Sequence, residues 1–268
     1  MKLLFVDLDE TLLSTDKTIS EDNLKAIERM VDAGHGFVIN TGRPFLSAYK
    51  IVKRYGFNKN NCFLSVFNGS QIYNAKDLKL LFKTGVEKEI ARVVFESAAE
   101  FNIHVHTYTE DKVVAERKTD MLLQYCKDVD MEYIIVEDAV SFVDKELPKI
   151  ICADLSDHEK LVKFQNHMKP IVDGKLYNLF SNPRLLEFGS LYSSKGRAIE
   201  ELSKVLNVSV KDTYSVGDEE NDIDMIKTAG TGFAMLNGKE TVKEVADIIT
   251  EFDNNNGGVA WIINNFIL

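Results

Sequence analysis

The chain has little cysteine, no long apolar run and no excess of positive charge. Its three cysteines, Cys62, Cys126 and Cys152, are odd in number and lie far apart among apolar residues. We therefore expect buried free thiols in a reducing compartment, not disulfides or metal ligands. No apolar run reaches the roughly 18 residues that a membrane span requires, and no signal-peptide pattern is visible at the N-terminus. The expectation is a cytoplasmic protein with no membrane partner.

The charge balance excludes a second class of partner. The chain carries 42 acidic and 32 basic residues, a net charge of −10. This argues against a nucleic-acid or anionic-membrane surface, because phosphate backbones select for an excess of Lys and Arg. A small phosphorylated substrate remains compatible, since a bound metal offsets its charge locally. The sequence does not distinguish a monomer from a homodimer.

Short apolar strands alternate with helical patterns in the first 80 and the last 80 of the 268 residues. The expected strands are 3–6, 37–39, 63–67, 213–216, 233–236 and 246–249. Helices are expected after Ser20, after Pro44, after Ser194 and over 223–229. Strands that alternate with helices predict crossover connections, and hence a doubly wound, Rossmann-like α/β core with a parallel sheet.

The middle of the chain has a different pattern. Strand candidates there are 103–108, 112–115 and 149–153, with a hairpin of 177–180 and 185–188 around a turn at 181–184. This mixture of helical faces and paired strands predicts an α+β domain inserted at 84–188. The core would then consist of residues 1–83 and 189–268, with hinges near 83–85 and 188–189. The asparagine- and glycine-rich stretch 254–258 is interpreted as a turn.

Two carboxylates, Asp7 and Asp9, follow the first strand one residue apart. Alternation along a strand points side chains i and i+2 the same way, and crowded like charges raise one another's pKa unless a cation or proton relieves them. Mg²⁺ would relieve them, leaving Asp7 as a nucleophile. Asp9 would protonate a leaving alcohol and later deprotonate the attacking water. Alone, such a pair is more simply a turn with a helix cap.

Three further polar signals favour the catalytic interpretation. They are Thr41-Gly42-Arg43 after a strand, Lys195 at a helix start, and Gly217-Asp218 with Asn221-Asp222. In an open parallel sheet the carboxyl ends of the strands face one crevice, where ligands bind. All four signals are therefore expected to converge there.

Each residue type meets one requirement of phosphoryl transfer. The Thr41 hydroxyl and the Gly42 amide can bind phosphate oxygens, because glycine lets the backbone approach closely. Lys195 supplies positive charge to the phosphate and the nucleophile. Asp218 completes a hard, oxygen-rich Mg²⁺ site with Asp7. Asn221 and Asp222 would orient this shell, with Asn221 also placed to contact the substrate.

These segments together resemble a known family. They are Asp7-Leu-Asp9-Glu-Thr11, Thr41-Gly42-Arg43, Ser194-Lys195-Gly196 and Gly217-Asp218-Glu-Glu-Asn221-Asp222. They are similar to the four motifs of haloacid-dehalogenase-like phosphatases, in the order and spacing of the Cof-type branch with its large α/β cap. The resemblance covers the whole chain.

The resemblance implies Mg²⁺-dependent hydrolysis of small phosphate monoesters through an aspartyl-phosphate. The implied substrates are sugar phosphates, pyridoxal phosphate or flavin mononucleotide, and the cap would set specificity. The implied metal ligands are the side chains of Asp7 and Asp218 and the backbone carbonyl of Asp9. Arg43 is expected to touch the phosphate or the substrate beyond it.

Several alternatives stay open. The same motifs would serve a phosphotransferase or mutase, which passes the phosphoryl group to another hydroxyl. A receiver-type signalling module or a non-catalytic metabolite sensor fits less well, because Asp7 and Asp9 are both present. Glu219 and Glu220 could face the site, but a place at a helix start is the expected one. Asn68-Gly69 fits a turn as well as a substrate contact.

Overall fold

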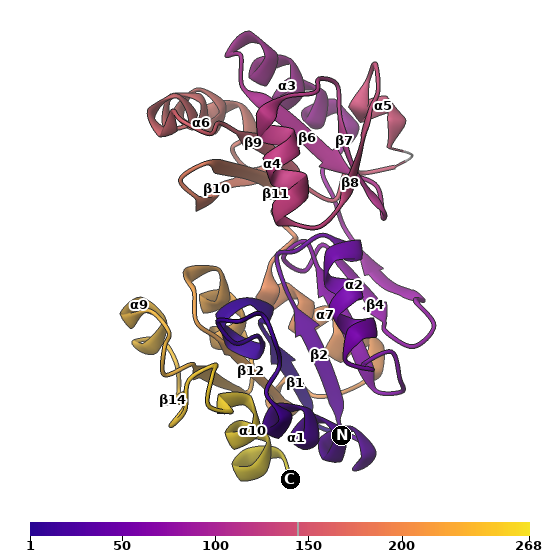
Figure 1. Cartoon of the computed structure of the whole chain (residues 1–268), viewed down its shortest axis with the longest axis vertical. Helices are drawn as coiled ribbons and strands as arrows, with labels where there is room; N and C mark the ends of the chain where they lie inside the picture. The colour runs from indigo at the N-terminus through magenta and orange to yellow at the C-terminus, as the bar shows by residue number, and fades with distance from the viewer. Residues whose placement is uncertain (144) are drawn as a thin grey trace. The chain divides into compact units, whose positions relative to one another are not determined.

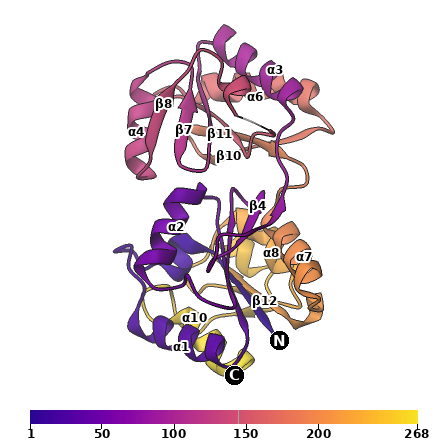
Figure 2. The ribbon, with the colours of Figure 1, turned by 90° about the vertical axis from the view of Figure 1, so that its right-hand side faces the viewer.

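The computed structural model describes residues 1–143 and 145–268. The chain folds into two compact units, coloured along the chain in Figures 1 and 2. We call Met1–Gly42, Ala48–Lys83 and Ser194–Leu268 the core unit, and Arg43–Ser47 with Thr84–Ser193 the inserted unit. The inserted unit extends past residue 188 because its last strand runs to Ser190.

The core unit contains a mostly parallel sheet. Its strands are β1 (Leu3–Val6), β2 (Gly36–Asn40), β3 (Cys62–Val66), β4 (Gln71–Asn74), β5 (Leu80–Lys83), β12 (Thr213–Gly217), β13 (Thr231–Ala234) and β14 (Ile248–Ile249). Among the described residues their order is β14-β13-β12-β1-β2-β3-β4-β5. The pairs from β14 to β3 are parallel, whereas β4 and β5 add an antiparallel edge. The predicted doubly wound α/β fold class is confirmed, although β4 and β5 were not predicted.

Helices pack on this sheet through apolar side chains. They are α1 (Glu21–Asp32), α2 (Phe45–Arg54, of which the first three residues group with the inserted unit), α7 (Lys195–Leu206), α8 (Ile223–Thr228), α9 (Glu240–Lys243) and α10 (Gly258–Ile262). Ser20 and Ser194 cap α1 and α7, each accepting a hydrogen bond from a backbone N–H in the first turn. Leu202 of α7 and Met225 of α8 join Phe5 and Val38 of the sheet in one buried cluster. This packing fixes the start of α7 beside the strand ends.

The inserted unit is an α+β domain with its own sheet. Its strands are β6 (His104–Tyr108), β7 (Lys112–Ala115), β8 (Glu132–Ile135), β9 (Ile150–Ala153), β10 (Leu176–Asn182) and β11 (Leu185–Ser190), and its helices are α3 (Lys88–Glu100), α4 (Asp120–Asp128), α5 (Ala139–Phe142) and α6 (His158–Val172). The strand order within the described residues is β10-β11-β9-β6-β7-β8. Phe95, Phe164 and Phe188 belong to its separate apolar core.

Two expectations from the composition concern the state of the cysteines and the lack of membrane-spanning helices. Cys62, Cys126 and Cys152 are buried and free, as predicted. Burial raises the pKa of the Cys62 thiol to about 11, so it stays protonated at neutral pH. Across residues 1–143 and 145–268, no helix combines the length and the apolar character that crossing a membrane would take.

Candidate active site

The polar segments predicted to converge follow neighbouring strands. β1 pairs in parallel with β12 on one side and with β2 on the other, with Val6 opposite both Val216 and Ile39. The Asp7 N–H continues this ladder and donates to the Val216 carbonyl at 3.0 Å. Residues just after these strands therefore share the carboxyl edge of the core sheet, where open α/β folds bind ligands.

A buried lysine joins two of the acidic segments. The Lys195 Nζ donates to Asp7 Oδ1 and to Asp222 Oδ1, each at 2.5 Å. The Lys195 and Asp222 side chains are fully buried, and that of Asp7 is 10% exposed. Burial opposes the lysine charge, but Asp222 and Asp7 outweigh it and raise the pKa of Lys195. The predicted contact between Lys195 and the nucleophile candidate is thus present in the geometry.

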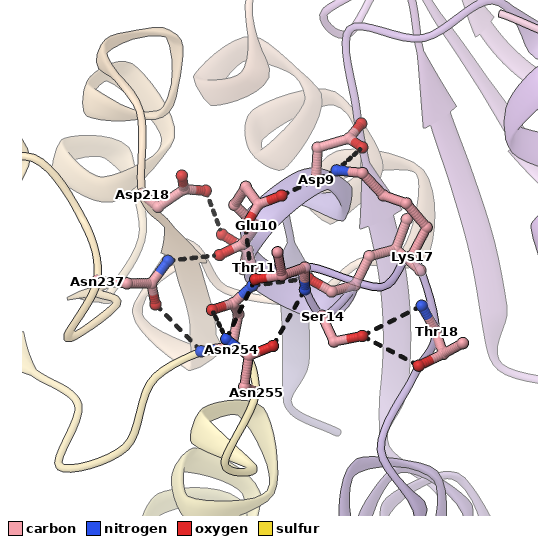
Figure 3. Close-up of polar contacts among 12 residues, drawn as sticks. Asp9, Glu10, Thr11, Ser14, Lys17, Thr18, Asp218, Asn237, Asn254 and Asn255 are labelled. Atoms are coloured by element: carbon pink, nitrogen blue, oxygen red, sulfur yellow. Dashed lines mark hydrogen bonds and ion pairs between the residues drawn. The ribbon is translucent and has the colours of Figure 1, made fainter.

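Asp218 lies in the same cluster. Its Oδ1 accepts a hydrogen bond from the Thr11 hydroxyl at 2.6 Å, which links the first and last segments (Figure 3). Asp222 Oδ2 accepts from the backbone N–H groups of Asp218 at 3.0 Å and Glu219 at 3.1 Å. One carboxylate oxygen from each of Asp7, Asp218 and Asp222 lies within 4.8 Å of the other two.

The electrostatics of this cluster favour a cation. Burial raises the pKa of Asp7 to about 8; Lys195 opposes this shift, and Asp222 and Asp218 add to it. Burial likewise raises the pKa of Asp218 to about 6, against the hydrogen bond from Thr11. Three buried carboxylates face one ammonium group, so oxygen ligands and excess negative charge fit a hard divalent ion such as Mg²⁺.

The loop after β1 is held by residues from distant parts of the chain (Figure 3). Residues Leu8–Leu12 form a π-helical turn that is interrupted at Glu10, which has a positive φ of 56°. The Asn237 Nδ2 donates to the Glu10 carbonyl at 2.8 Å. The Asn254 Nδ2 donates to Glu10 Oε2 and to the Leu13 carbonyl, both at 3.1 Å. These contacts hold the side chain and carbonyl of Glu10 and the backbone at Leu13.

Asp9 differs from Asp7 in its surroundings. Its side chain is 39% exposed and pairs with the Lys17 Nζ at 3.4 Å, while Lys17 also bonds Glu10 at 2.9 Å. Figure 3 shows Asp9 directed toward Lys17. The Asp9 carboxylate is not one of the three clustered carboxylates, which belong to Asp7, Asp218 and Asp222.

The second motif is split between buried and partly exposed residues. Thr41 is buried at the end of β2, with its N–H donating to the Ser65 carbonyl at 2.9 Å. Gly42 lies against Asn68, because a Cβ on Gly42 would be 2.8 Å from the Asn68 Oδ1. Arg43 is half-buried and groups with the inserted unit.

The fourth motif, residues 217–222, also contains both buried and exposed residues. Asp222 is fully buried, whereas its neighbour Asn221 is exposed on the turn Glu220–Asp222. Glu219 and Glu220 pair with Lys239 at 2.8 Å and 3.9 Å. Exposed pairs of this kind contribute little energy, but they lie beside the acidic cluster, because the Lys239 N–H donates to the Asp218 carbonyl at 2.9 Å and the charge of Glu219 adds to the raised pKa of Asp218.

Comparisons with known proteins decide the family. Residues 4–263 match the family model described as haloacid dehalogenase-like hydrolase. The chain belongs to this family. It is 26% identical to the 5-amino-6-(5-phospho-D-ribitylamino)uracil phosphatase YwtE of Bacillus subtilis, over 100% of this chain and 98% of that protein. YcsE of the same organism, which bears the same phosphatase name, is 27% identical over 100% and 96% of the two chains.

Solved structures agree with the family assignment. A haloacid dehalogenase-like hydrolase from Bacteroides thetaiotaomicron has a TM-score of 0.90 and 27% identity, over 98% of both chains. TM0651 from Thermotoga maritima has a TM-score of 0.88 and 25% identity, over 99% of this chain and 97% of that one. The family predicted from the four motifs is confirmed, and the protein is a haloacid dehalogenase-like phosphatase-type enzyme.

This haloacid dehalogenase-like core also uses residues to which the sequence assigns no role. Asn40 is fully buried; its Nδ2 donates to the Lys195 carbonyl at 2.9 Å, and its Oδ1 accepts from the Ser65 hydroxyl at 2.7 Å. Asn40 thereby ties β2 to the start of α7. Its only sequence signal is an amide at the end of a strand that is otherwise apolar.

The inserted unit has a buried polar chain of its own. His104 and His106 are hydrogen-bonded to each other at 3.0 Å, and His106 continues to Tyr108 at 3.3 Å. Burial lowers the pKa of His104 to about 4, so it is neutral at physiological pH. Lys149 and Glu187 form a buried ion pair at 2.9 Å. Glu187 is therefore occupied by a structural partner in this unit.

Proposed function

We propose that this chain is a Mg²⁺-dependent phosphatase that hydrolyses small phosphate monoesters through an aspartyl-phosphate on Asp7. Sugar phosphates are the first candidates, with pyridoxal phosphate and flavin mononucleotide as further ones. The observation that carries the proposal is the Lys195 Nζ held 2.5 Å from both Asp7 and Asp222, beside Asp218. A reactive carboxylate, a fixed cation and an oxygen-rich metal site are the parts that phosphoryl transfer requires.

The metal would be held by the side chains of Asp7 and Asp218 and by the backbone carbonyl of Asp9. When bound, Mg²⁺ supplies charge neutralisation at the phosphoryl oxygens. Asp222 keeps both Lys195 and the Asp218 backbone in place through its two oxygens. The loop contacts of Asn237 and Asn254 hold the segment that contains Asp9.

The reaction would proceed in two steps on this chain's carboxylates. An Asp7 oxygen attacks phosphorus, the bond to the leaving oxygen breaks, and Asp9 donates its proton to the alcohol. Asp9 then takes a proton from water as that water attacks the aspartyl-phosphate. Cleavage of the Asp7–phosphorus bond releases inorganic phosphate and restores both carboxyl groups.

The remaining residues would bind and orient the phosphoryl group. The Thr41 hydroxyl and the Gly42 N–H donate to its oxygens, and Lys195 compensates its charge. Arg43 and Asn221 contact the substrate beyond the phosphate. The inserted unit acts as the cap that selects the leaving group. A cytoplasmic location fits small metabolites as substrates.

The names of the relatives guide the choice of substrates. YwtE and YcsE are named as phosphatases of a phosphoribitylamino compound, a sugar-alcohol phosphate. At 26% and 27% identity this supports a phosphorylated polyol or sugar, without fixing which one. The panel therefore spans hexose, pentose and polyol phosphates, pyridoxal phosphate, flavin mononucleotide and nucleotides.

The test measures phosphate release across this panel with Mg²⁺ and with a chelator. We expect metal-dependent release confined to one or two classes, and loss of turnover in Asp7→Asn with the fold intact. Asp16→Asn, on the exposed turn after the loop, is the matched control and should retain full activity. Turnover by Asp7→Asn equal to wild type would refute the mechanism. Consumption of an ester without phosphate release would favour the phosphotransferase alternative.

A further inference from the structure

The loop that follows β3 has a strained backbone. Phe67, Asn68 and Gly69 have φ angles of 52°, 54° and 82°, so three successive residues are left-handed. Glycine adopts this region freely and asparagine tolerates it, but it is unfavourable for a bulky side chain. Phe67 is nevertheless only 1% exposed. Such strain persists where the surroundings enforce it, and it gathers at functional sites.

Two segments of the candidate site hold this loop. On one side, the Asn68 N–H donates to the Thr41 carbonyl at 3.0 Å. On the other, a Cβ on Gly69 would lie 2.1 Å from the carbonyl oxygen of Ser194, the N-cap of α7. Only glycine fits at that point, so the loop is packed directly against the residue that precedes Lys195.

The bond from Asn68 sets the direction of one peptide group. Thr41 is held at both ends, since its N–H donates to Ser65 and its carbonyl accepts from Asn68. No peptide bond in the described chain is cis, and in a trans peptide the C=O and N–H point in opposite directions. The Gly42 N–H is therefore turned away from the Asn68 N–H, in a fixed orientation.

The Asn68 side chain adds a second constraint. Its Oδ1 is buried and, within residues 1–143 and 145–268, has no hydrogen-bond partner. This oxygen lies 2.8 Å from the point where a Cβ on Gly42 would be. An unpaired buried carbonyl lowers stability, so the stability of the fold does not account for it. What the contact does achieve is to confine Gly42.

We propose that Asn68 is a positioning residue for phosphoryl binding. It holds the Thr41–Gly42 peptide in the orientation that presents the Gly42 N–H to a phosphoryl oxygen. The inference rests on the proposed function, because it takes Thr41 and Gly42 as the phosphoryl-binding segment. Asn68 acts through Gly42 and does not itself touch the substrate.

The deciding variant is Asn68→Gly. Glycine keeps the left-handed backbone and removes the unpaired carbonyl, so the melting temperature should stay unchanged or rise. Glycine also keeps the N–H that bonds the Thr41 carbonyl, so the variant removes only the side-chain contact that confines Gly42. Inorganic phosphate should then bind about tenfold more weakly in the presence of Mg²⁺. For an ester substrate KM should rise with little change in kcat, since an interaction shared by ground and transition states is weakened.

Asn207 supplies a matched control in the same unit. It also has a φ of 54°, as the C-cap of α7, and it is exposed. Asn207→Gly should affect stability in the same direction and leave phosphate binding and KM unchanged. A second check uses Gly42→Ala, whose methyl group meets Asn68. Its loss of phosphate affinity should be smaller in the Asn68→Gly background.

The outcomes separate this inference from the proposed function. Phosphate binding and KM equal to wild type in Asn68→Gly would overturn it, as would a melting temperature that falls together with activity. A wild-type protein that binds phosphate but hydrolyses no ester would refute the phosphatase proposal alone. Phosphate binding by Asn68→Gly would still decide whether Asn68 is a positioning residue. A wild-type protein that binds no phosphate with Mg²⁺ would overturn both.

Discussion

At the scale of single residues, burial raises the pKa values of Asp7 and Asp218, and neighbouring carboxylates add to both shifts. A bound metal ion would lower these pKa values, because it binds the deprotonated carboxylates. The carboxyl pKa of Asp218 is raised from 3.8 to about 6, first by burial and then by nearby carboxylates. When a carboxyl group has a higher pKa in the folded protein than in the unfolded one, it favours folding most at a pH below both values. This contribution is lost as the pH rises from the unfolded-state pKa through the folded-state pKa. Without a cation, Asp218 thus destabilises the fold increasingly between pH 4 and about 6.

This shift predicts how Mg²⁺ stabilisation depends on pH. At about pH 5 Mg²⁺ has to displace a proton from Asp218, whereas at about pH 8 this carboxylate is already ionised. The rise in melting temperature at a fixed Mg²⁺ concentration should therefore be larger at the higher pH. Differential scanning fluorimetry of wild type and Asp218→Asn measures it, and the variant should show a smaller rise at the higher pH. An equal rise at both pH values in wild type would contradict the assignment of Asp218 as a ligand.

At the scale of elements, the loop after β1 depends on contacts that span almost the whole chain. Asn254 is 2% exposed and donates both protons of its amide to the loop after β1. Its neighbour Asn255 contacts Thr15 at the surface instead. One turn near the C-terminus therefore contacts the loop that carries Asp9 through one buried and one exposed asparagine.

Removing that amide tests the restraint. Asn254→Ala leaves the Leu13 carbonyl and the Glu10 carboxylate without this donor and should lower stability by about 1–3 kcal/mol. The loosened loop should also weaken Mg²⁺ binding, measured calorimetrically with the metal alone. Asn255→Ala is the neighbouring control, and its effect should stay within about 0.5 kcal/mol. Unchanged stability and metal affinity in Asn254→Ala would show that the loop holds its own shape.

Some of these elements could be predicted from the sequence, and others could not. Asp7 follows a short apolar strand, Asp218 follows a short strand that ends in Val216-Gly217, and the start of α7 has a serine cap. The sequence pattern alone therefore located these segments together with the fold class. β5 and β8 escaped prediction because both have exposed ends and only half-buried middles, which leaves no clear alternation. The role of Asn254 could not be predicted, because its hydrogen-bond partner Glu10 lies 244 residues away in the sequence. Asparagine is also common in turns, so its presence there gives no signal.

At the scale of the whole molecule, the two units have separate apolar cores, and the acidic cluster with Lys195 lies in only one of them. Asp7, Lys195, Asp218 and Asp222 all belong to the core unit. Phe164 lies in the core of the inserted unit, fully buried, with its ring centroid 5.3 Å from that of Phe101. Damage to that core should therefore remain local, because stability is not uniform across a structure.

Phe164→Ala tests this separation. Loss of a buried phenyl ring costs about 3–5 kcal/mol, so amide exchange should accelerate across Thr84–Ser193. Exchange in β1 and β12 should stay as in wild type, and inorganic phosphate with Mg²⁺ should bind within about twofold, since no proposed phosphate ligand lies in that core. Phe5→Ala, an equally buried substitution on β1, should have the opposite distribution and weaken phosphate binding. If Phe164→Ala accelerated exchange equally in β1, the two units would unfold as one, and the core of the inserted unit could not be altered without disturbing the proposed catalytic carboxylates.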